Sequence, residues 1–138
     1  VLAVPKDLPL AKKKMITLAE ITDLPLIHRD RGSSTRKILE KALQKQKITP
    51  TITLEVGSRE GAREASISGL GISYVGLHEF QPHPDISMVT IKDTSLVSKS
   101  YLIYSKEMAS LPMVKAVVEI ITQMKSDKKS PSLDGLNK

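Results

Sequence analysis

The sequence predicts an α/β fold, in which a mostly parallel β-sheet carries helices on its faces. Short apolar segments alternate with segments whose apolar residues recur at helical spacing, and this alternation favours a parallel sheet. Apolar residues make up 40% of the 138 residues, which is enough for one compact domain with its own core. Aromatic residues make up only 3%, so Leu, Ile, Val, Met and Ala must build that core.

Local signals place the elements of the first half of the chain. Residues 1–4 are apolar and predict a short buried strand, and a loop rich in proline and lysine follows it. Thr17 and Glu20 have the spacing of a capping box, so a short helix is expected to begin there and to end at Pro25. The next expected elements are a strand at 26–28, a helix from 32–35 to about 46, a strand at 51–56 and a helix at 59–68.

The second half of the chain begins with a turn and ends with a helix. Gly69 and Gly71 predict the end of a helix and a tight turn. Pro112 is expected near the first position of the last helix, whose wide apolar stripe reaches Met124. The remaining expected elements are strands at 72–75, 87–91 and 97–104 and a disordered polar tail at 126–138.

The formal net charge of +6 has two interpretations. Nucleic-acid binding is one, but the lysines are spread along the chain and almost no aromatic residues are available to stack on bases. A solvated surface with a basic tail is favoured instead. A mildly positive field that attracts a small anion fits the charge equally well.

Composition also excludes several classes of protein. The sequence contains no cysteine, which excludes a disulfide scaffold, a thiolate zinc site and a cysteine nucleophile. No apolar run approaches the roughly 20 residues that a membrane span needs. The segment Val1–Pro5 has neither an initiator Met nor the features of a signal peptide, so the chain is interpreted as a fragment that begins in mid-strand.

The loop 28–36 is the first candidate binding site. It follows an expected strand and presents Gly32 and the hydroxyls of Ser33, Ser34 and Thr35 where a helix begins. Ligands of α/β sheets bind beside such helix N-termini, and the groups present suit a carboxylate, a phosphonate or a phosphate. The alternative is that Ser33 or Ser34 only caps the helix.

The turn Gly57-Ser58 is the second candidate, because it again places a glycine and a hydroxyl between a strand and a helix. Gly57 would let a ligand approach closely. The alternative is a plain turn with Ser58 as the helix N-cap. The neighbouring pairs Arg59-Glu60 and Arg63-Glu64 are interpreted as charge pairing on the helix surface.

The sequence predicts a binding module and not an enzyme. His28, His78 and His83 lie in three different segments, so no metal site is expected, and no cofactor is expected either. An enzyme that uses His28, Arg29 and Asp30 is the alternative, but no acid–base pair stands at a spacing that would support it. No GxSxG motif and no complete dinucleotide fingerprint occurs.

Several consecutive motifs carry a family resemblance. They are ITLAEITDLPLI at 16–27, RDRGSSTRKILEKAL at 29–43, ITPTITLEVGSREGAREASISGLGISYV at 48–75, PHPDISMVTIKD at 82–93 and SYLIYSKE at 100–107. In this order and spacing they resemble the effector-binding domain of LysR-type bacterial transcription regulators. The stretch GSREGAREASISGLGISYV followed by HPD is most similar to the regulators associated with aminoethylphosphonate catabolism.

The resemblance implies a periplasmic-binding-protein-like (type II) fold of two α/β subdomains joined by crossover strands, with the effector in the cleft. Residues 1–5 would be one crossover strand and residues 6–95 the complete second subdomain. Residues 96–125 would supply a return strand and a helix of the first subdomain, most of which is absent. DNA binding would need an N-terminal winged helix-turn-helix that is also absent.

The resemblance further implies a role and a site. The role is effector sensing in a cytoplasmic transcription regulator, and the alternative is an extracytoplasmic solute-binding protein of the same fold. The expected partners are a small anionic effector and further copies of the chain, in a homodimer or higher homo-oligomer, without a membrane. The expected effector-binding residues are Arg29, Gly32, Ser33, Ser34, Thr35, Gly57, Ser58, Tyr74 and Val75.

Overall fold

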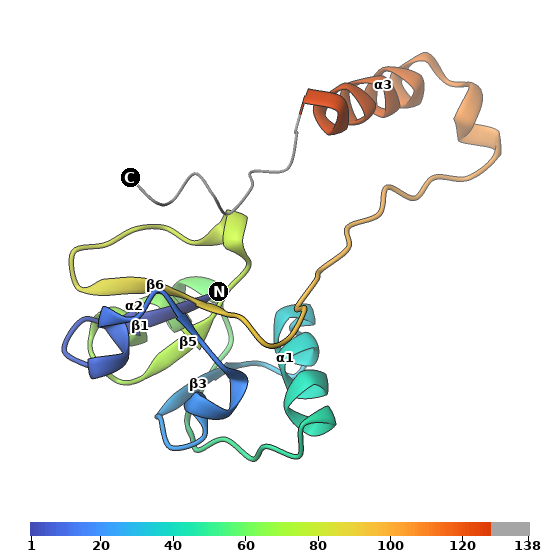
Figure 1. Ribbon diagram of the computed structural model, residues 1–138. Coiled ribbons are helices and arrows are strands. Elements are labelled where there is room, and N and C mark those ends of the chain that lie inside the picture. Colours follow the sequence, from blue (N-terminus) through green and yellow to red (C-terminus); the bar gives the residue numbers. More distant parts are fainter. Residues whose placement is uncertain (128–138) are drawn as a thin grey trace. The chain divides into compact units, whose positions relative to one another are not determined.

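The computed structural model describes residues 1–127 and divides the chain into two compact units, Val1–Lys99 and Ser100–Lys138 (Figure 1). The boundary after Lys99 lies close to the expected one after residue 95, and the assignment of these parts to two subdomains stays a prediction. Most of the expected tail 126–138 lies outside the described residues. None of the helices within 1–127 has the length and apolar character that crossing a bilayer requires.

The first unit is built on a six-stranded sheet in the order β2-β6-β1-β5-β3-β4. Parallel pairing joins β3 to β4, β3 to β5 and β2 to β6, whereas β1 runs antiparallel to both β5 and β6. The expected mostly parallel sheet is therefore confirmed, with β1 as the exception. The strands are β1 (Leu2–Pro5), β2 (Met15–Ile16), β3 (Leu26–Arg29), β4 (Ile52–Val56), β5 (Ile72–Tyr74) and β6 (Ile86–Ile91).

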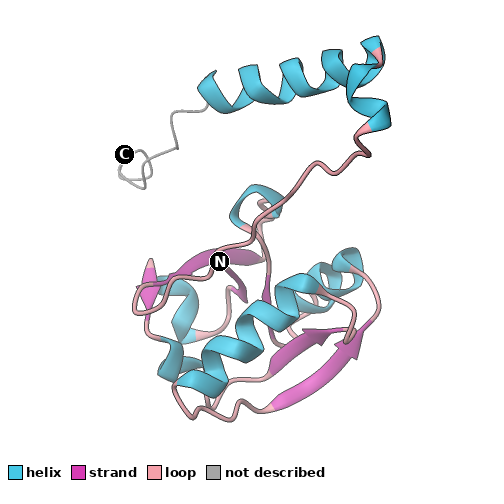
Figure 2. Cartoon of the chain, turned by 90° about the vertical axis from the view of Figure 1, so that its right-hand side faces the viewer, coloured by secondary structure: helices cyan, strands magenta, loops and turns pink. Residues whose placement is uncertain are grey.

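Two helices, α1 (Ser34–Lys45) and α2 (Arg59–Ile67), pack on opposite faces of this sheet (Figure 2). Leu26 packs in the larger core cluster with Leu39 of α1, and the next residue of the strand, Ile27, packs with Ala62 and Ala65 of α2. Successive side chains of a strand point to opposite faces, so the two clusters lie on either side of β3. Because β3 and β4 are parallel, their C-terminal ends and the N-termini of α1 and α2, which follow them, lie at the same end of the sheet.

The predicted turns are also present. Glu20 accepts a hydrogen bond from the backbone N–H of Thr17 (2.7 Å), as the capping box requires, but the helix that follows is a single 3-10 turn, Leu18–Ile21. Gly71 has a φ of +153°, and a Cβ atom there would lie 2.3 Å from the carbonyl oxygen of Pro25. Only glycine fits this position, because the backbone of residue 72 must approach Pro25 closely enough to donate a hydrogen bond of 2.8 Å.

The strand predicted at 97–104 is wrong, since these residues have no regular secondary structure. A strand needs a neighbour for its backbone groups, and no segment within residues 1–127 pairs with this one. The predicted helix at Pro112 is confirmed as α3 (Pro112–Asp127) and follows a 3-10 turn, Glu107–Ser110. Most large apolar side chains of this second unit are exposed: Tyr101, Leu102, Ile103, Tyr104, Met108, Leu111, Met113, Val117, Ile120 and Met124.

Candidate functional site

A pocket of about 270 Å³ lies in the first unit, at the edge of the sheet where β3 and β5 end and α1 and α2 begin. This volume lies just below the roughly 300–1,000 Å³ that is usual for small-molecule sites. Its walls come from β1, β5, α2 and the segment after β5. The lining residues are Ala3, Arg29, Thr35, Arg59, Glu60, Ala62, Arg63, Ser73, Tyr74, Val75, His78, Glu79, Phe80, Gln81 and Ile86.

Three arginines contribute to the wall of this pocket. Arg59 pairs across it with Glu79 at 3.0 Å, and more than half of the Arg59 side chain stays exposed. Arg29 and Arg63 pair with the residues that follow them in sequence, at 3.4 and 2.6 Å. The Nε atoms of both are buried and have no hydrogen-bond partner among residues 1–127. The pocket therefore concentrates positively charged donors that the protein itself satisfies only in part.

Free backbone N–H groups add to this positive character. The hydroxyl of Ser58 accepts a hydrogen bond from Gly61 N (2.9 Å). The backbone N–H groups of Arg59 and Glu60 have no acceptor within residues 1–127. Thr35 holds the same position in α1 as Glu60 does in α2, and its N–H is likewise unpaired in the described part of the chain. Such N–H groups carry the positive end of the helix dipole, so both helices favour an anion in the pocket.

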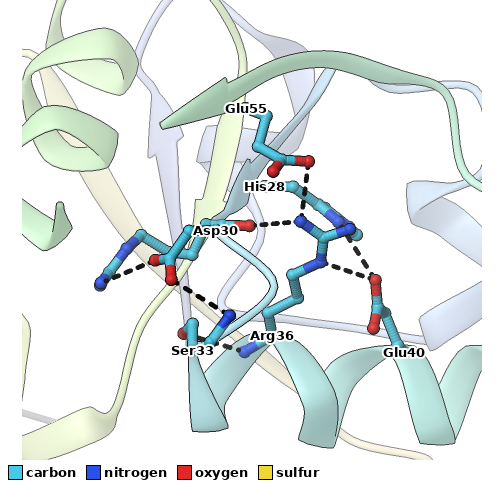
Figure 3. Close-up of polar contacts among 8 residues, drawn as sticks. His28, Asp30, Ser33, Arg36, Glu40 and Glu55 are labelled. Carbon is cyan, nitrogen blue, oxygen red and sulfur yellow. Dashed lines mark hydrogen bonds and ion pairs between the residues drawn. The ribbon is translucent and has the colours of Figure 1, made fainter. Parts of the chain in front are cut away.

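The loop before α1 is already occupied by side chains of the protein (Figure 3). The side-chain carboxylate of Asp30 accepts a hydrogen bond from Gly32 N (3.1 Å). The backbone carbonyl of Asp30 accepts another from Ser33 N (3.0 Å). The hydroxyl of Ser33 accepts from Arg36 N (3.3 Å), so it caps the helix. A Cβ at Gly32 would lie 2.8 Å from the Asp30 carboxylate, so this glycine makes room for Asp30.

Arg36 ties this loop to the sheet (Figure 3). Its guanidinium donates to the carbonyl of Arg29 (2.6 Å), to Glu55 of β4 (2.8 Å) and to Glu40 of α1 (2.7 Å). The hydrogen bonds to Glu40, the largest contribution, and to Glu55 raise the pKa of Arg36 above its ordinary value. Arg36 does not line the pocket, and its role is to hold the Arg29 backbone in place.

His28 lies behind this network on β3 and is 3% exposed. Neither ring nitrogen has a hydrogen-bond partner within residues 1–127, and Nδ1 lies 3.7 Å from the Glu40 carboxylate. Burial lowers the pKa of His28 below its ordinary value, and the charge of Arg36 lowers it further. Burial therefore favours the neutral form of the imidazole. No three His, Cys, Asp or Glu side chains of the described residues gather as a metal site would require.

The predicted site residues divide into two groups. Arg29, Thr35, Tyr74 and Val75 line the pocket, although their spacing in the sequence is wide. Burial raises the pKa of the Tyr74 phenol, and its hydroxyl makes no hydrogen bond within residues 1–127. The remaining predicted residues lie beside the pocket and do not line it, and their part in binding stays a prediction: Gly32, Ser33, Ser34, Gly57 and Ser58.

Other lining residues were missed from the sequence. Arg59 and Arg63 are one helical turn apart, and this spacing was the available signal for two cations on one face of α2. The predicted surface pairing is confirmed for Arg63 with Glu64, but Arg59 pairs with Glu79 from a distant segment. Ser73 had no signal of its own, because nothing local distinguishes it from other strand residues.

The sheet belongs to an α/β domain of the periplasmic-binding-protein-like (type II) fold. The family profile described as "LysR substrate binding domain" matches residues 1–126. The chain belongs to this family, as its motifs predict.

Curated relatives agree with this assignment. The chain is 30% identical over 135 residues to the HTH-type transcriptional regulator CysL of Bacillus subtilis (strain 168), a match that covers 96% of this chain and 44% of the relative. It is 30% identical over 101 residues to the HTH-type transcriptional activator CmpR of Synechocystis sp. (strain ATCC 27184 / PCC 6803 / Kazusa), covering 71% of this chain and 33% of the relative. These relatives are transcriptional regulators and not enzymes. The chain spans less than half of their length.

Solved structures show the same fold. The CcmR regulatory domain of Synechocystis PCC6803, solved in complex with 2-PG, has a TM-score of 0.71 at 22% identity and covers 96% of this chain and 64% of its own. The effector binding domain of QuiR, solved in complex with shikimate, has a TM-score of 0.68 at 18% identity, covering 93% and 61%. At these identities the likeness concerns the fold alone.

Proposed function

We propose that this chain is the effector-sensing part of a LysR-type transcription regulator, and that its effector is a small anion bound in the pocket between α2 and β5. The observation that carries the proposal is the convergence of Arg29, Arg59 and Arg63 on one pocket beside two helix N-termini. Buried donors without partners favour a ligand that accepts hydrogen bonds, and their charge selects an anion. The matched family favours a regulator over a solute-binding protein.

The complete protein would act in the cytoplasm as a homodimer or larger homo-oligomer and would contact DNA through a separate winged helix-turn-helix. Support for this comes from the regulators that the chain matches over less than half of their length. The exposed apolar side chains of the second unit support association with further protein surface. Within the anions, a phosphonate is the specific proposal that follows from the resemblance at 57–75.

A thermal-shift panel on the full-length protein tests the proposed ligand class. The probes are inorganic phosphate, methylphosphonate, 2-aminoethylphosphonate, acetate and succinate. A ligand at 100 times its Kd stabilises the folded state by about 2.7 kcal/mol, which raises the unfolding midpoint by several degrees. If none of these anions raises the midpoint, the proposal is wrong.

Variants of the pocket arginines test where the ligand binds. Arg59→Ala and Arg63→Ala are expected to remove the ligand-induced shift, because each removes a cation from the pocket wall. Arg31→Ala is the matched control, since Arg31 is exposed and does not line the pocket. A shift that survives both α2 variants would contradict the proposed location.

Ser34→Ala separates the pocket from the loop predicted at 28–36. Ser34 is exposed and lies outside the pocket lining. Loss of the shift in this variant would place the ligand over the α1 N-terminus, and retention would place it in the pocket.

A further inference from the structure

Two serine hydroxyls meet where α2 packs on β5. Ser66 and Ser73 form a hydrogen bond of 2.8 Å, with Ser66 fully buried and Ser73 3% exposed. Ser73 lines the pocket, whereas Ser66 does not. The serine pair thus connects the interior between helix and sheet with the wall of the candidate site.

One of the two hydroxyl hydrogens of this serine pair takes part in no hydrogen bond within residues 1–127. Two hydroxyl groups carry two hydrogens, and the bond between them consumes one. No other hydrogen bond of either hydroxyl occurs in the described part of the chain. A buried O–H without an acceptor is unfavourable, so the second hydrogen must belong to the hydroxyl that can reach a partner. Ser66 is enclosed, so it donates to Ser73, and Ser73 can donate into the pocket.

The charges around the pocket limit what that acceptor can be. Arg29, Arg59 and Arg63 line it together with Glu60 and Glu79, and Asp30 and Glu64 pair with Arg29 and Arg63 from beside it. The buried arginine Nε–H groups without a partner suit one anionic group. A second charged group beside these carboxylates would meet repulsion, so the oxygen that faces Ser73 should be uncharged.

We infer that the pocket selects a small anion with a second, uncharged oxygen, a hydroxyl or a carbonyl, which accepts the free hydrogen of Ser73. This inference rests on the proposed function and narrows it. The arginines bind the anionic group of the ligand, and the Ser73 hydroxyl donates a hydrogen bond to its uncharged oxygen. The contrary view is that the two serines only fill the narrow contact between α2 and β5. In that case the hydroxyls would have no effect on which anion binds.

Isosteric ligands distinguish the two views. The probes are 2-hydroxyethylphosphonate against propylphosphonate and glycolate against propionate, and the anionic group found in the thermal-shift panel decides which pair is used. Within a pair only a hydroxyl replaces a methyl group. The methyl compound is the more apolar and is favoured by burial alone, so tighter binding of the hydroxyl compound needs a hydrogen-bond partner.

The experiment is calorimetric titration of the full-length protein with both members of the pair. We expect the hydroxyl compound to bind about tenfold tighter in the wild type, and Ser73→Ala to abolish this preference. Ser66→Ala is expected to reduce the preference, because the Ser73 hydroxyl loses the donor that orients it. Ser68→Ala is the matched control, since Ser68 is exposed at the end of the same helix.

The outcomes separate this inference from the proposed function. Equal or tighter binding of the methyl compound by the wild type, or an unchanged preference in Ser73→Ala, would overturn the inference and leave the anion site in place. An unchanged preference in Ser66→Ala would overturn the orienting role of Ser66. Loss of all anion binding in Arg59→Ala, with the hydroxyl preference lost only in Ser73→Ala, is the result expected if both proposals hold.

Discussion

The loops before α1 and α2 share one pattern, in which a strand is followed by a glycine, then a serine, then a helix. In both, the serine hydroxyl accepts a hydrogen bond from the N–H three residues later, Ser33 from Arg36 and Ser58 from Gly61. Their surroundings differ. Before α1, the Asp30 carboxylate occupies the loop, while a Cβ added at Gly57 would meet no atom within 4 Å beyond its chain neighbours.

On the proposed function, one local pattern serves two purposes. An internal carboxylate satisfies the backbone of the first loop, and Arg36 then fastens it to the sheet. Within residues 1–127 no carboxylate accepts a hydrogen bond from the backbone of the second loop, and Arg59 and Arg63 of α2 line the pocket. A helix N-terminus that no internal carboxylate satisfies is open to an external anion. Variants before α1 are therefore expected to act on stability, and variants in α2 on binding.

The largest difference in stability is expected between variants of Arg36 of α1 and Arg59 of α2. Arg36→Ala should lower the free energy of unfolding by about 2–3 kcal/mol, because three hydrogen bonds of a mostly buried guanidinium are lost. Arg59→Ala should change it by less than about 1 kcal/mol, since its ion pair is solvent-exposed. Chemical denaturation of both variants measures the difference. Equal destabilisation by the two substitutions would contradict the distinction between the loops.

The two caps are expected to be equivalent and smaller in effect. Ser33→Ala and Ser58→Ala should each lower the free energy of unfolding by about 1 kcal/mol, because each leaves one N–H at a helix start without its acceptor. Ser34→Ala, whose hydroxyl caps neither helix, serves as the control in the same denaturation series. A large cost for only one of the two caps would show that the loops differ in stability as well as in charge.

A pH dependence is expected on the α1 side only. Burial holds the pKa of His28 below its ordinary value of 6.5, so the unfolded chain binds a proton more readily than the folded one. This contribution to stability is complete above about pH 6.5 and is lost as the pH falls toward the lower pKa of the folded state.

Between pH 7 and pH 6 the loss should stay below about 1 kcal/mol, since one proton changes the free energy of unfolding by at most about 1.4 kcal/mol per pH unit. Denaturation at both pH values measures it. His28→Gln should flatten the dependence. A steeper dependence in His28→Gln would contradict the assignment.

The smallest effect is expected from the two glycines. Gly32→Ala brings a methyl group against Asp30 and displaces its carboxylate from the backbone N–H, whereas Gly57→Ala meets open space. We expect Gly57→Ala to be neutral or to stabilise the protein by about 0.5 kcal/mol, through a less flexible unfolded chain, and Gly32→Ala to be the less stable of the two. Thermal unfolding of the pair measures the difference, and the reverse order would contradict it.

Local signals predicted most elements of the first unit. The starts of α1 and α2 follow from their serine caps, and the turn at Gly71 follows from its glycine. The strand predicted at 97–104 failed because an apolar, β-branched sequence does not supply the partner that a strand needs. Sequence pattern also carries no information on the direction of β1 in the sheet.

The site was predictable only in part, because its contacts join distant segments. The lining residue Thr35 was predicted from the strand–glycine–helix pattern, and Arg29, Tyr74 and Val75 were predicted from the family resemblance. The pairing of Arg59 with Glu79 depends on how the segment after β5 returns toward α2. Hydrogen bonds between residues far apart in sequence leave no regular spacing to recognise, and Ser66 and Ser73 were missed for the same reason.

The position of β1 has a consequence for how the chain acquires its structure. β1 lies inside the sheet, and Leu2 pairs with both Tyr74 of β5 and Val89 of β6. These pairs join residues that lie far apart in the sequence. Closing such long loops slows folding, because chain entropy is lost before the contacts form. We therefore expect the parallel strands β3, β4 and β5 to pair early in folding. The sheet is expected to be completed only when β6 pairs with β1. A chain shortened before Ile86 would leave β1 open along one edge, and such an edge is prone to aggregate.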